Sequence, residues 1–264
     1  TVTVSQDFWV TNPGYGVSLP ISQGGKFIED YWACPKATRE YYGLNISLEK
    51  RFSNNWQGGI NYTLSRVSGN YSGLASSDEG GRLGPSVEQD FDRWFMGYDG
   101  QGKVLDGPLP QDRTHYFKAF GSYTFRFGLT VGIVGYGRSG LPQTTKILYN
   151  SKYFYVNGRN DLGRLPFTAW ADVYLDYALK IGGKMRASIN LQINNITDTD
   201  TIQSKITTAD RQSFTGYTTE ILNGTFAKDY MSIIASRGIA HPAFNQWETR
   251  FGPWSARLGF KFSF

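Results

Sequence analysis

The sequence has one cysteine and no long hydrophobic run. Cys34 stands alone among 264 residues, so neither a disulfide within the chain nor a zinc cluster of several cysteines can form. No segment approaches the roughly 18 apolar residues that a membrane-spanning helix needs, and the mean hydropathy is −0.39. These absences exclude a disulfide-stapled scaffold and a helical membrane protein, but not a membrane barrel, whose strands place polar residues between apolar ones.

Signals for catalysis and nucleic-acid binding are also scarce. The net charge is +5, but lysines and arginines are scattered with acidic residues between them, so we predict no nucleic-acid partner. The sequence has no Gly-x-Ser-x-Gly nucleophile motif and no Gly-rich phosphate loop. Asp172 and Asp176 lie on the same face of a predicted strand. We interpret them as solvated charges along that face rather than as a catalytic acid–base pair. We therefore predict no enzymatic activity and no cofactor.

Metal-binding patterns are weak. Asp198 and Asp200 follow two asparagines, and such clustered oxygens can hold Ca²⁺. Asn and Asp also begin loops for conformational reasons, and we favour that interpretation. The two histidines, His115 and His241, are isolated from any carboxylate at fixed spacing. We predict no metal site, with Asp198 and Asp200 as the candidate ligands if one exists.

The C-terminal segment alternates strictly between apolar and polar residues. Phe264, Phe262, Phe260, Leu258 and Ala256 alternate with serine, lysine, glycine and arginine. A two-residue period separates two faces only in a β-strand. An exposed edge strand with so many aromatic side chains would promote aggregation in water, whereas lipid accommodates that face.

The same alternation recurs along the chain and predicts an all-β fold, a transmembrane antiparallel barrel with about eight strands present. We expect strands at about residues 1–11, 40–52, 56–66, 115–127, 129–138, 168–181, 184–196 and 250–264. Short turns separate the strands of each hairpin, and much longer segments join the hairpins. These segments are predicted to be extracellular loops, at about residues 13–38, 67–112, 139–166 and 197–248, the last with a short helix within 219–236.

The alternation also predicts which way side chains point. The ten residue steps from Trp254 to Phe264 span about 33 Å of strand, or about 25 Å of height at a tilt of about 40°, which matches the apolar band of an outer-membrane barrel. Aromatic residues near the turns are expected in a girdle at the periplasmic interface: Phe52, Trp56, Phe125 and Phe127. Polar residues are expected to face the lumen, among them Asp172, Asp176, Arg186, Asn190 and Gln192.

Aromatic residues in the predicted loops have two equal interpretations. The group includes Trp94, Tyr98, Tyr153 and Tyr155. They could capture a hydrophobic or glycan-like ligand, or they could pack the loops against one another or against a neighbouring protein.

Several segments resemble those of TonB-dependent outer-membrane receptors of the Oar-like group. The resemblance covers most of the chain from about residue 39 and is carried by these segments: 39–44, 50–56, 62–66, 69–71, 112–115, 127–129, 139–142, 163–166 and the terminal phenylalanine. The long loops match poorly, so the ligand stays open.

This resemblance implies an importer driven by the proton-motive force, with a barrel of about 22 strands around a plug domain. The chain would then be the C-terminal part of such a barrel, with outer-membrane lipid, the plug, the remaining strands and a TonB-type energy-coupling protein as partners. It also implies that Phe264, with Phe262 and Phe260, is the signal for the outer-membrane assembly machinery of a Gram-negative-type bacterium.

The chain begins with Thr1 and has no basic-then-apolar leader, so we expect a processed chain or part of a longer one.

Two other interpretations of the fold stay open. The first is a complete eight-stranded barrel that acts as an anchor or as a subunit of a larger assembly, and it requires the strand at 1–11 to pair with the strand at 250–264. Both ends of the chain are expected in the periplasm. A soluble carbohydrate-binding β-sandwich is the least favoured interpretation.

Overall fold

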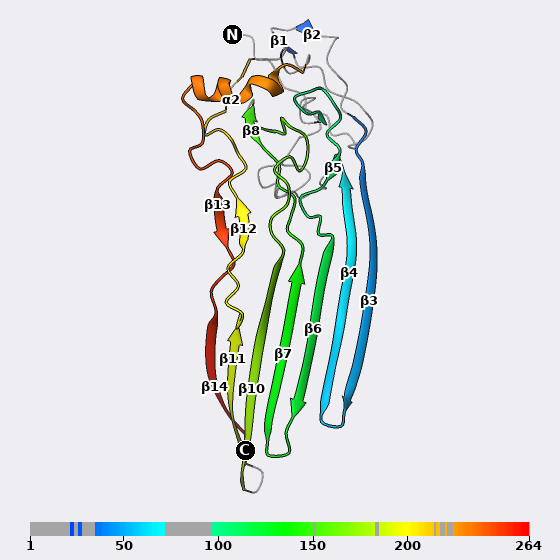
Figure 1. Cartoon of the computed structure of the whole chain (residues 1–264), viewed down its shortest axis with the longest axis vertical. Helices are drawn as coiled ribbons and strands as arrows, with labels where there is room; N and C mark the ends of the chain where they lie inside the picture. Colours follow the sequence, from blue (N-terminus) through cyan, green and yellow to red (C-terminus); the bar gives the residue numbers. More distant parts are fainter. Residues whose placement is uncertain are drawn as a thin grey trace, which may run out of the picture.

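One antiparallel sheet of long strands runs the length of the molecule (Figure 1). The computed structural model describes residues 22–23, 26–27, 35–71, 97–149, 152–182, 185–213, 215–216, 220 and 224–263. The predicted strand at 1–11, the loop residue Trp94 and the terminal Phe264 lie outside the described residues.

Seven long strands form the body of this sheet, in the order β14-β11-β10-β7-β6-β4-β3. Their bounds are β3 (Arg39–Ser53), β4 (Trp56–Gly69), β6 (His115–Thr124), β7 (Leu129–Arg138), β10 (Thr168–Gly182), β11 (Met185–Asn194) and β14 (Ser255–Ser263). The short strand β5 (Gly107–Pro108) pairs with the end of β4 and brings the count to eight. Within the described residues the sheet is not closed, and β3 and β14 form its two edges.

The strand register keeps apolar residues on one face and polar residues on the other. Leu191 of β11 lies between Leu175 of β10 and Leu258 of β14. Its neighbour Asn190 lies between Asp176 and Gly259. Since successive side chains point to opposite faces, a one-residue slip of any strand would exchange its two faces.

Tight turns join the strands at one end of the sheet. Asn54 and Asn55 connect β3 to β4 with positive φ values of 52° and 66°, the geometry of a hairpin turn that asparagine tolerates. Gly128 connects β6 to β7 with φ of 99°. β6 therefore ends at Thr124, three residues before the predicted position, because residues 125–128 form the turn.

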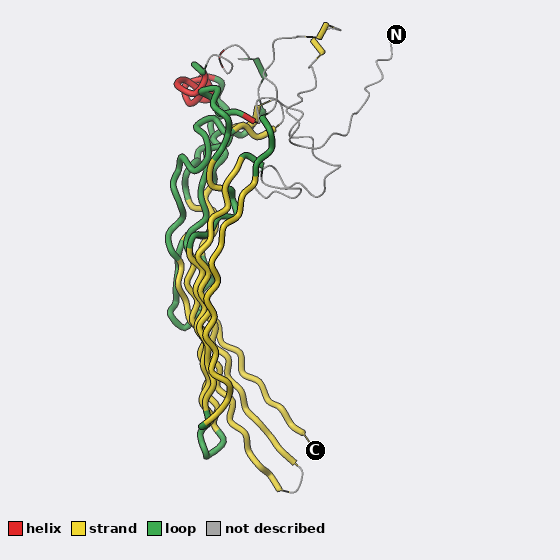
Figure 2. Tube along the Cα trace, turned by 90° about the vertical axis from the view of Figure 1, so that its right-hand side faces the viewer, coloured by secondary structure: helices red, strands yellow, loops and turns green. Residues whose placement is uncertain are grey.

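The opposite end of the molecule carries the long connections (Figure 2), and two of them, residues 139–166 and 197–248, share a core of their own. The long connections contain the short strands β1 (Ser22–Gln23), β2 (Lys26–Phe27), β8 (Ile147–Tyr149), β9 (Lys152–Phe154), β12 (Ile202–Lys205) and β13 (Trp247–Arg250), and the helix α2 (Phe226–Ser236). We call their buried cluster the loop core: Ile147, Tyr149, Phe154, Val156, Ala209, Phe226, Tyr230 and Ile234. In the described part of the chain, no helix is long and apolar enough to cross a membrane.

The last strand differs from its predicted boundaries, whereas the helix lies within its predicted segment. α2 lies within the predicted segment 219–236 and buries Phe226, Tyr230 and Ile234, which lie four residues apart on one helical face. The predicted strand at 250–264 is split, because residues up to Arg250 pair with β12 in the loop region while β14 begins at Ser255. Packing against the loop core positions the helix, and pairing with β12 separates β13 from β14.

Three segments meet where the loops join the sheet, and we call this junction the rim. The buried carboxylate of Asp112 pairs with the guanidinium of Arg164 and accepts a hydrogen bond from the backbone amide of Val67 at 2.5 Å. The Arg164 guanidinium also donates to the carbonyl oxygens of Asp112 and Gly140, at 3.1 and 3.3 Å. The rim thus joins residues 112–115, 139–142 and 163–166, three of the segments that carry the family resemblance.

Gly140 is required where two chain segments cross at the rim. A Cβ atom at this position would overlap the backbone carbonyl group of Leu165. A backbone group cannot rotate away as a flexible side chain can, so any larger residue forces the segments apart.

The Gly140→Ala variant should lose about 1–3 kcal/mol of unfolding free energy, the usual cost of overpacking. Denaturant titration of the protein in detergent measures the loss. Gly252→Ala is the matched control, because a Cβ at Gly252 meets no atom within 4 Å. Equal stability of the two variants would contradict the close approach at the rim.

Candidate functional site

One face of the sheet exposes large apolar side chains over its whole width. Phe260 on β14 is 75% exposed and Leu48 on β3 is 70% exposed, at opposite edges of the sheet. Ile133 and Leu179 are exposed on the strands between them. Monomeric soluble proteins rarely expose apolar patches of more than a few hundred Å². This face therefore needs an apolar environment.

The same face has a hollow of about 910 Å³ where residues are small. Gly58, Gly121 and Gly135 leave space there between β4, β6 and β7, and the lining is predominantly apolar. A hollow of this kind accommodates hydrocarbon chains without any polar contact.

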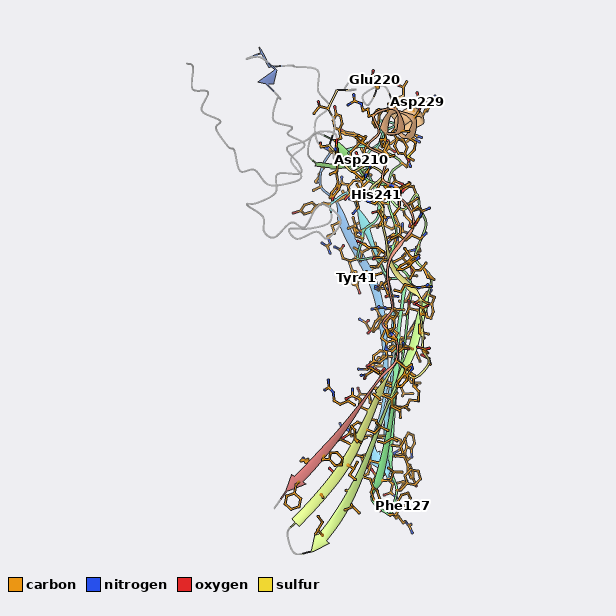
Figure 3. The ribbon with its side chains drawn as sticks, turned by 90° about the vertical axis from the view of Figure 1, so that its left-hand side faces the viewer. Tyr41, Phe127, Asp210, Glu220, Asp229 and His241 are labelled. Atoms are coloured by element: carbon orange, nitrogen blue, oxygen red, sulfur yellow. The ribbon has the colours of Figure 1, made fainter. Side chains whose placement is uncertain are left out.

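Aromatic side chains gather on this face beside the tight turns. Phe125 lies between Tyr123 and Phe127, with ring centroids 4.7 and 5.3 Å away. Figure 3 shows Phe127 at the turn end of the molecule. The Lys50 ammonium lies 4.0 Å from the Trp56 ring centroid and donates to the carbonyl oxygen of Ser53 at 3.0 Å. Amphipathic rings and a lysine that reaches back toward the turn are typical of a membrane interface.

The opposite face is polar and carries the residues predicted to face a lumen. Asp172 accepts a hydrogen bond at 2.8 Å from the backbone amide of Asn195. Gln192 donates to Asn194 at 2.9 Å, and Asp176 pairs in register with Asn190. For Arg186 only the backbone is described, in register with Ser263.

A hollow of about 410 Å³ lies on this polar face, and we call it the polar-face hollow. Gly132 leaves the space, and the predicted residues Asp172 and Gln192 line it. Three aromatic residues that the sequence analysis did not select also line it: Phe120, Tyr136 and Tyr174. Their positions in the sequence could have indicated this role, because each of them lies where the alternation of its strand places residues on the polar face.

A ladder of rings and cations rises from the polar-face hollow toward the loops. Tyr136 stacks on Trp170 with ring centroids 4.7 Å apart and an interplanar angle of 15°. Lys118 lies 5.7 Å from the Tyr136 ring, and the guanidinium of Arg138 lies 5.2 Å from the Trp170 ring. Phe251 continues the ladder, 4.8 Å from Trp170. Cation–π and stacking contacts of this kind fix the orientation of the Tyr136 ring.

The candidate metal ligands make structural contacts. Asp200 forms an ion pair with Arg250 at 2.9 Å, and the Asp198 carboxylate lies 3.5 Å from the Trp254 amide nitrogen. Buried Asn195 donates to the carbonyl oxygens of Thr199 and Gly252, at 3.0 and 2.8 Å. Among the described residues no group of three or more His, Cys, Asp or Glu could hold a metal ion.

The loop aromatics divide between the two interpretations. Tyr155 is 1% exposed, and its ring lies 5.2 Å from the Arg159 guanidinium, so it packs inside the loop region. Tyr153 on β9 is partly buried under the Lys146 ammonium, 5.3 Å from its ring centroid. Tyr98 forms a β-bridge with Val104 in a neighbouring turn. Ligand contact by Tyr98 and Tyr153 stays a prediction.

A buried carboxylate stands at the edge of the loop core. Asp210 is 1% exposed, and both of its carboxylate oxygens accept hydrogen bonds from the Leu148 amide, at 2.9 and 3.0 Å. Figure 3 shows Asp210 and His241 at the loop end. Burial raises the pKa of Asp210 from 3.8 to about 6, against the opposing effects of the Leu148 amide and His241.

Loop-core stability should therefore fall as the pH rises from about 4 to 6. In this window folded Asp210 keeps a proton that the unfolded chain has released, so folding is most favoured below the window and loses about 3 kcal/mol above it. Asp210→Asn should remove this pH dependence, because an amide does not titrate, and its carbonyl oxygen can still accept from Leu148. Hydrogen exchange of loop-core amides at pH 4 and 7 tests this, and Asp229→Asn, at an exposed position of α2, is the control.

Comparison with known proteins agrees with this architecture. No family model matches the chain. Over 196 residues the chain is 29% identical to the TonB-dependent transporter Oar of Myxococcus xanthus. The match covers 72% of this chain but 17% of that protein, so the chain spans a small part of its curated relative. The resemblance predicted from the sequence is thereby confirmed: most of this chain is similar to a segment of a TonB-dependent transporter of the Oar type.

Proposed function

We propose that the chain is the C-terminal barrel segment of a TonB-dependent outer-membrane transporter that imports an unidentified ligand. The observation that carries the proposal is the two-faced sheet, with exposed apolar residues on one face and polar residues on the other. A strand exposed to lipid must have all its backbone groups paired within the sheet, which antiparallel barrel strands achieve.

The arrangement of the connections supports an orientation in the membrane. Outer-membrane barrels have short periplasmic turns and long extracellular loops. The turns at Asn54 and Gly128 would then lie in the periplasm, together with both ends of the chain, and the loop core would be extracellular. The aromatic residues beside the turns would occupy the periplasmic interface. The terminal phenylalanines, Phe260, Phe262 and Phe264, would be read by the assembly machinery.

The polar face would line the lumen and contact a plug domain. Asp172, Asp176, Asn190 and Gln192 would provide part of that surface, together with Arg186. Extracellular loops would capture the ligand, and a TonB-type protein would supply the energy for plug rearrangement. Transport rather than catalysis is supported by the similarity to a TonB-dependent transporter.

The match covers only a small share of the relative. This supports the interpretation that the chain is part of a large barrel rather than a small closed barrel. Seven long strands form an open sheet among the described residues, whereas barrels of this family have about 22 strands. The remaining strands and the plug would come from outside this chain. A closed anchor barrel would instead need β14 to pair with residues 1–11.

Charged substitutions on the two faces should have unequal effects. Leu191→Arg should cost about 2–4 kcal/mol of unfolding free energy in lipid vesicles, because the arginine would face hydrocarbon near the midplane. Asn190→Arg, on the adjacent position of the same strand, should change it little. Denaturant titration in vesicles measures both, and equal tolerance would contradict the membrane assignment.

Disulfide cross-linking in outer membranes should show which strand lies beside β14. In a Cys34→Ser background, cysteines placed along residues 2–10 should cross-link to a cysteine in β3, such as Ile46→Cys, and not to Leu258→Cys in β14. This follows because, in a large barrel, β14 pairs with a strand from outside the chain. Efficient cross-linking to Leu258→Cys would instead establish a small closed barrel.

A further inference from the structure

We propose that the hollow of about 910 Å³ on the apolar face binds one anionic phospholipid, with the phosphate at Lys50 and one acyl chain in the hollow. We call this cavity the apolar-face hollow. The proposal rests on the proposed function, which places this face against lipid and the tight turns on the periplasmic side. The bound molecule would therefore belong to the periplasmic leaflet.

The floor of the apolar-face hollow consists of residues with little or no side chain. Gly58 of β4 pairs in register with Gly121 of β6, and Ala119 of β6 pairs with Gly135 of β7. Exposed aliphatic side chains surround this floor: Leu48, Ile60 and Ile133. A hydrocarbon chain that lies in the depression would gain van der Waals contacts on several sides, whereas a chain on an even surface is contacted on one side alone.

The end of the apolar-face hollow beside the tight turns carries polar groups. Trp56 of β4 pairs in register with Tyr123 of β6, and the Lys50 ammonium lies 4.0 Å from the Trp56 ring centroid. All three residues line the hollow. Indole, phenol and ammonium groups suit the level of lipid headgroups. The hollow is thus polar at one end and apolar along the rest, which is the polarity of a phospholipid.

Lys50 carries a positive charge that no described residue neutralises. Its ammonium donates to the Ser53 hydroxyl at 2.7 Å and to the carbonyl oxygens of Ser53, Trp56 and Arg51 at 3.0, 3.2 and 3.3 Å. These oxygens are neutral, and Lys50 forms no ion pair within the part of the chain that the structure describes. Its sequence neighbour Glu49 belongs to the opposite face, since successive side chains alternate.

An anionic phosphate complements this charge. Hydrogen bonds to an ionised acceptor are about twice as strong as those to a neutral one, so a phosphate oxygen would replace the longest of the Lys50 contacts. A zwitterionic headgroup brings its own cation close to Lys50, which weakens the attraction. A hydrophobic helix of another protein would cover the apolar part of the hollow without supplying an anion at Lys50.

Gly135 offers a substitution that fills the apolar-face hollow without strain. A Cβ at Gly135 meets no atom within 4 Å, so Gly135→Val suits the strand, and its methyl groups would occupy the position of the acyl chain. Gly132→Val is the matched control. Gly132 lies three residues along β7 on the opposite face, where a Cβ would make ordinary contacts, the shortest at 3.7 Å from the Tyr174 Cβ.

The charge is tested by Lys50→Gln, because its amide can still donate to the Ser53 carbonyl oxygen. Lys118→Gln is the matched control, since Lys118 also lies beside aromatic rings, those of Phe120 and Tyr136, but on the polar face.

Lipid titration followed by native mass spectrometry measures the affinities, with the full polypeptide that carries this chain in detergent. The probes are phosphatidylglycerol and phosphatidylcholine with the same palmitoyl and oleoyl chains, and oleate. The wild type should bind phosphatidylglycerol at least tenfold more tightly than phosphatidylcholine. Gly135→Val should weaken phosphatidylglycerol binding at least tenfold, and Lys50→Gln should remove the preference between the two phospholipids. Both control variants should bind as the wild type does.

Three results would overturn the proposal: the wild type binds the two phospholipids equally, Gly135→Val binds phosphatidylglycerol as tightly as the wild type, or oleate binds as tightly as phosphatidylglycerol. Membrane insertion is measured separately on the same preparations, by the vesicle titration described for Leu191. Insertion without a preference for phosphatidylglycerol would overturn this proposal alone, whereas failure to insert would overturn the proposed function.

Discussion

The register between neighbouring strands is the constraint on which the rest of the molecule depends. Each long strand has one apolar and one polar face, and seven strands in register combine them into two continuous surfaces. Because side chains alternate with a period of two, no strand can shift by one residue without placing polar groups among apolar ones. Leu175, Leu191 and Leu258 show this alignment on adjacent strands, and the polar-face hollow is its counterpart on the other side.

The long connections are stabilised in a different way from the sheet. Connections of this length must bury apolar residues or remain unstructured, and here two of them, residues 139–166 and 197–248, share the loop core. The rim then fixes this region to the sheet through the ion pair of Arg164 with the buried Asp112, and both side chains also hydrogen-bond to backbone groups. The close approach at Gly140 allows this junction to form.

The sequence predicts the sheet face of a residue that lies in a periodic strand. It does not predict the role of a residue whose surroundings come from distant segments of the chain. The alternation from Met185 to Asn194 places Gln192 and Asn190 on one face without reference to any other strand. In contrast, Tyr136 and Tyr174 acquire their role in the polar-face hollow from Gly132 between them, a neighbour only across strands. Asp210 likewise lies in a segment predicted only as a loop, and burial beside Leu148 raises the pKa of its carboxylate.

The sequence by itself determined the two-faced strands, the tight turns at asparagine and glycine, and the resemblance to a TonB-dependent receptor, because these features reside in neighbouring residues. Tertiary structure alone decided the loop core, the rim and the polar-face hollow. Each of these joins residues far apart in the chain, such as Val67, Asp112 and Arg164. Their contacts depend on which strands lie side by side, and no local pattern encodes that order.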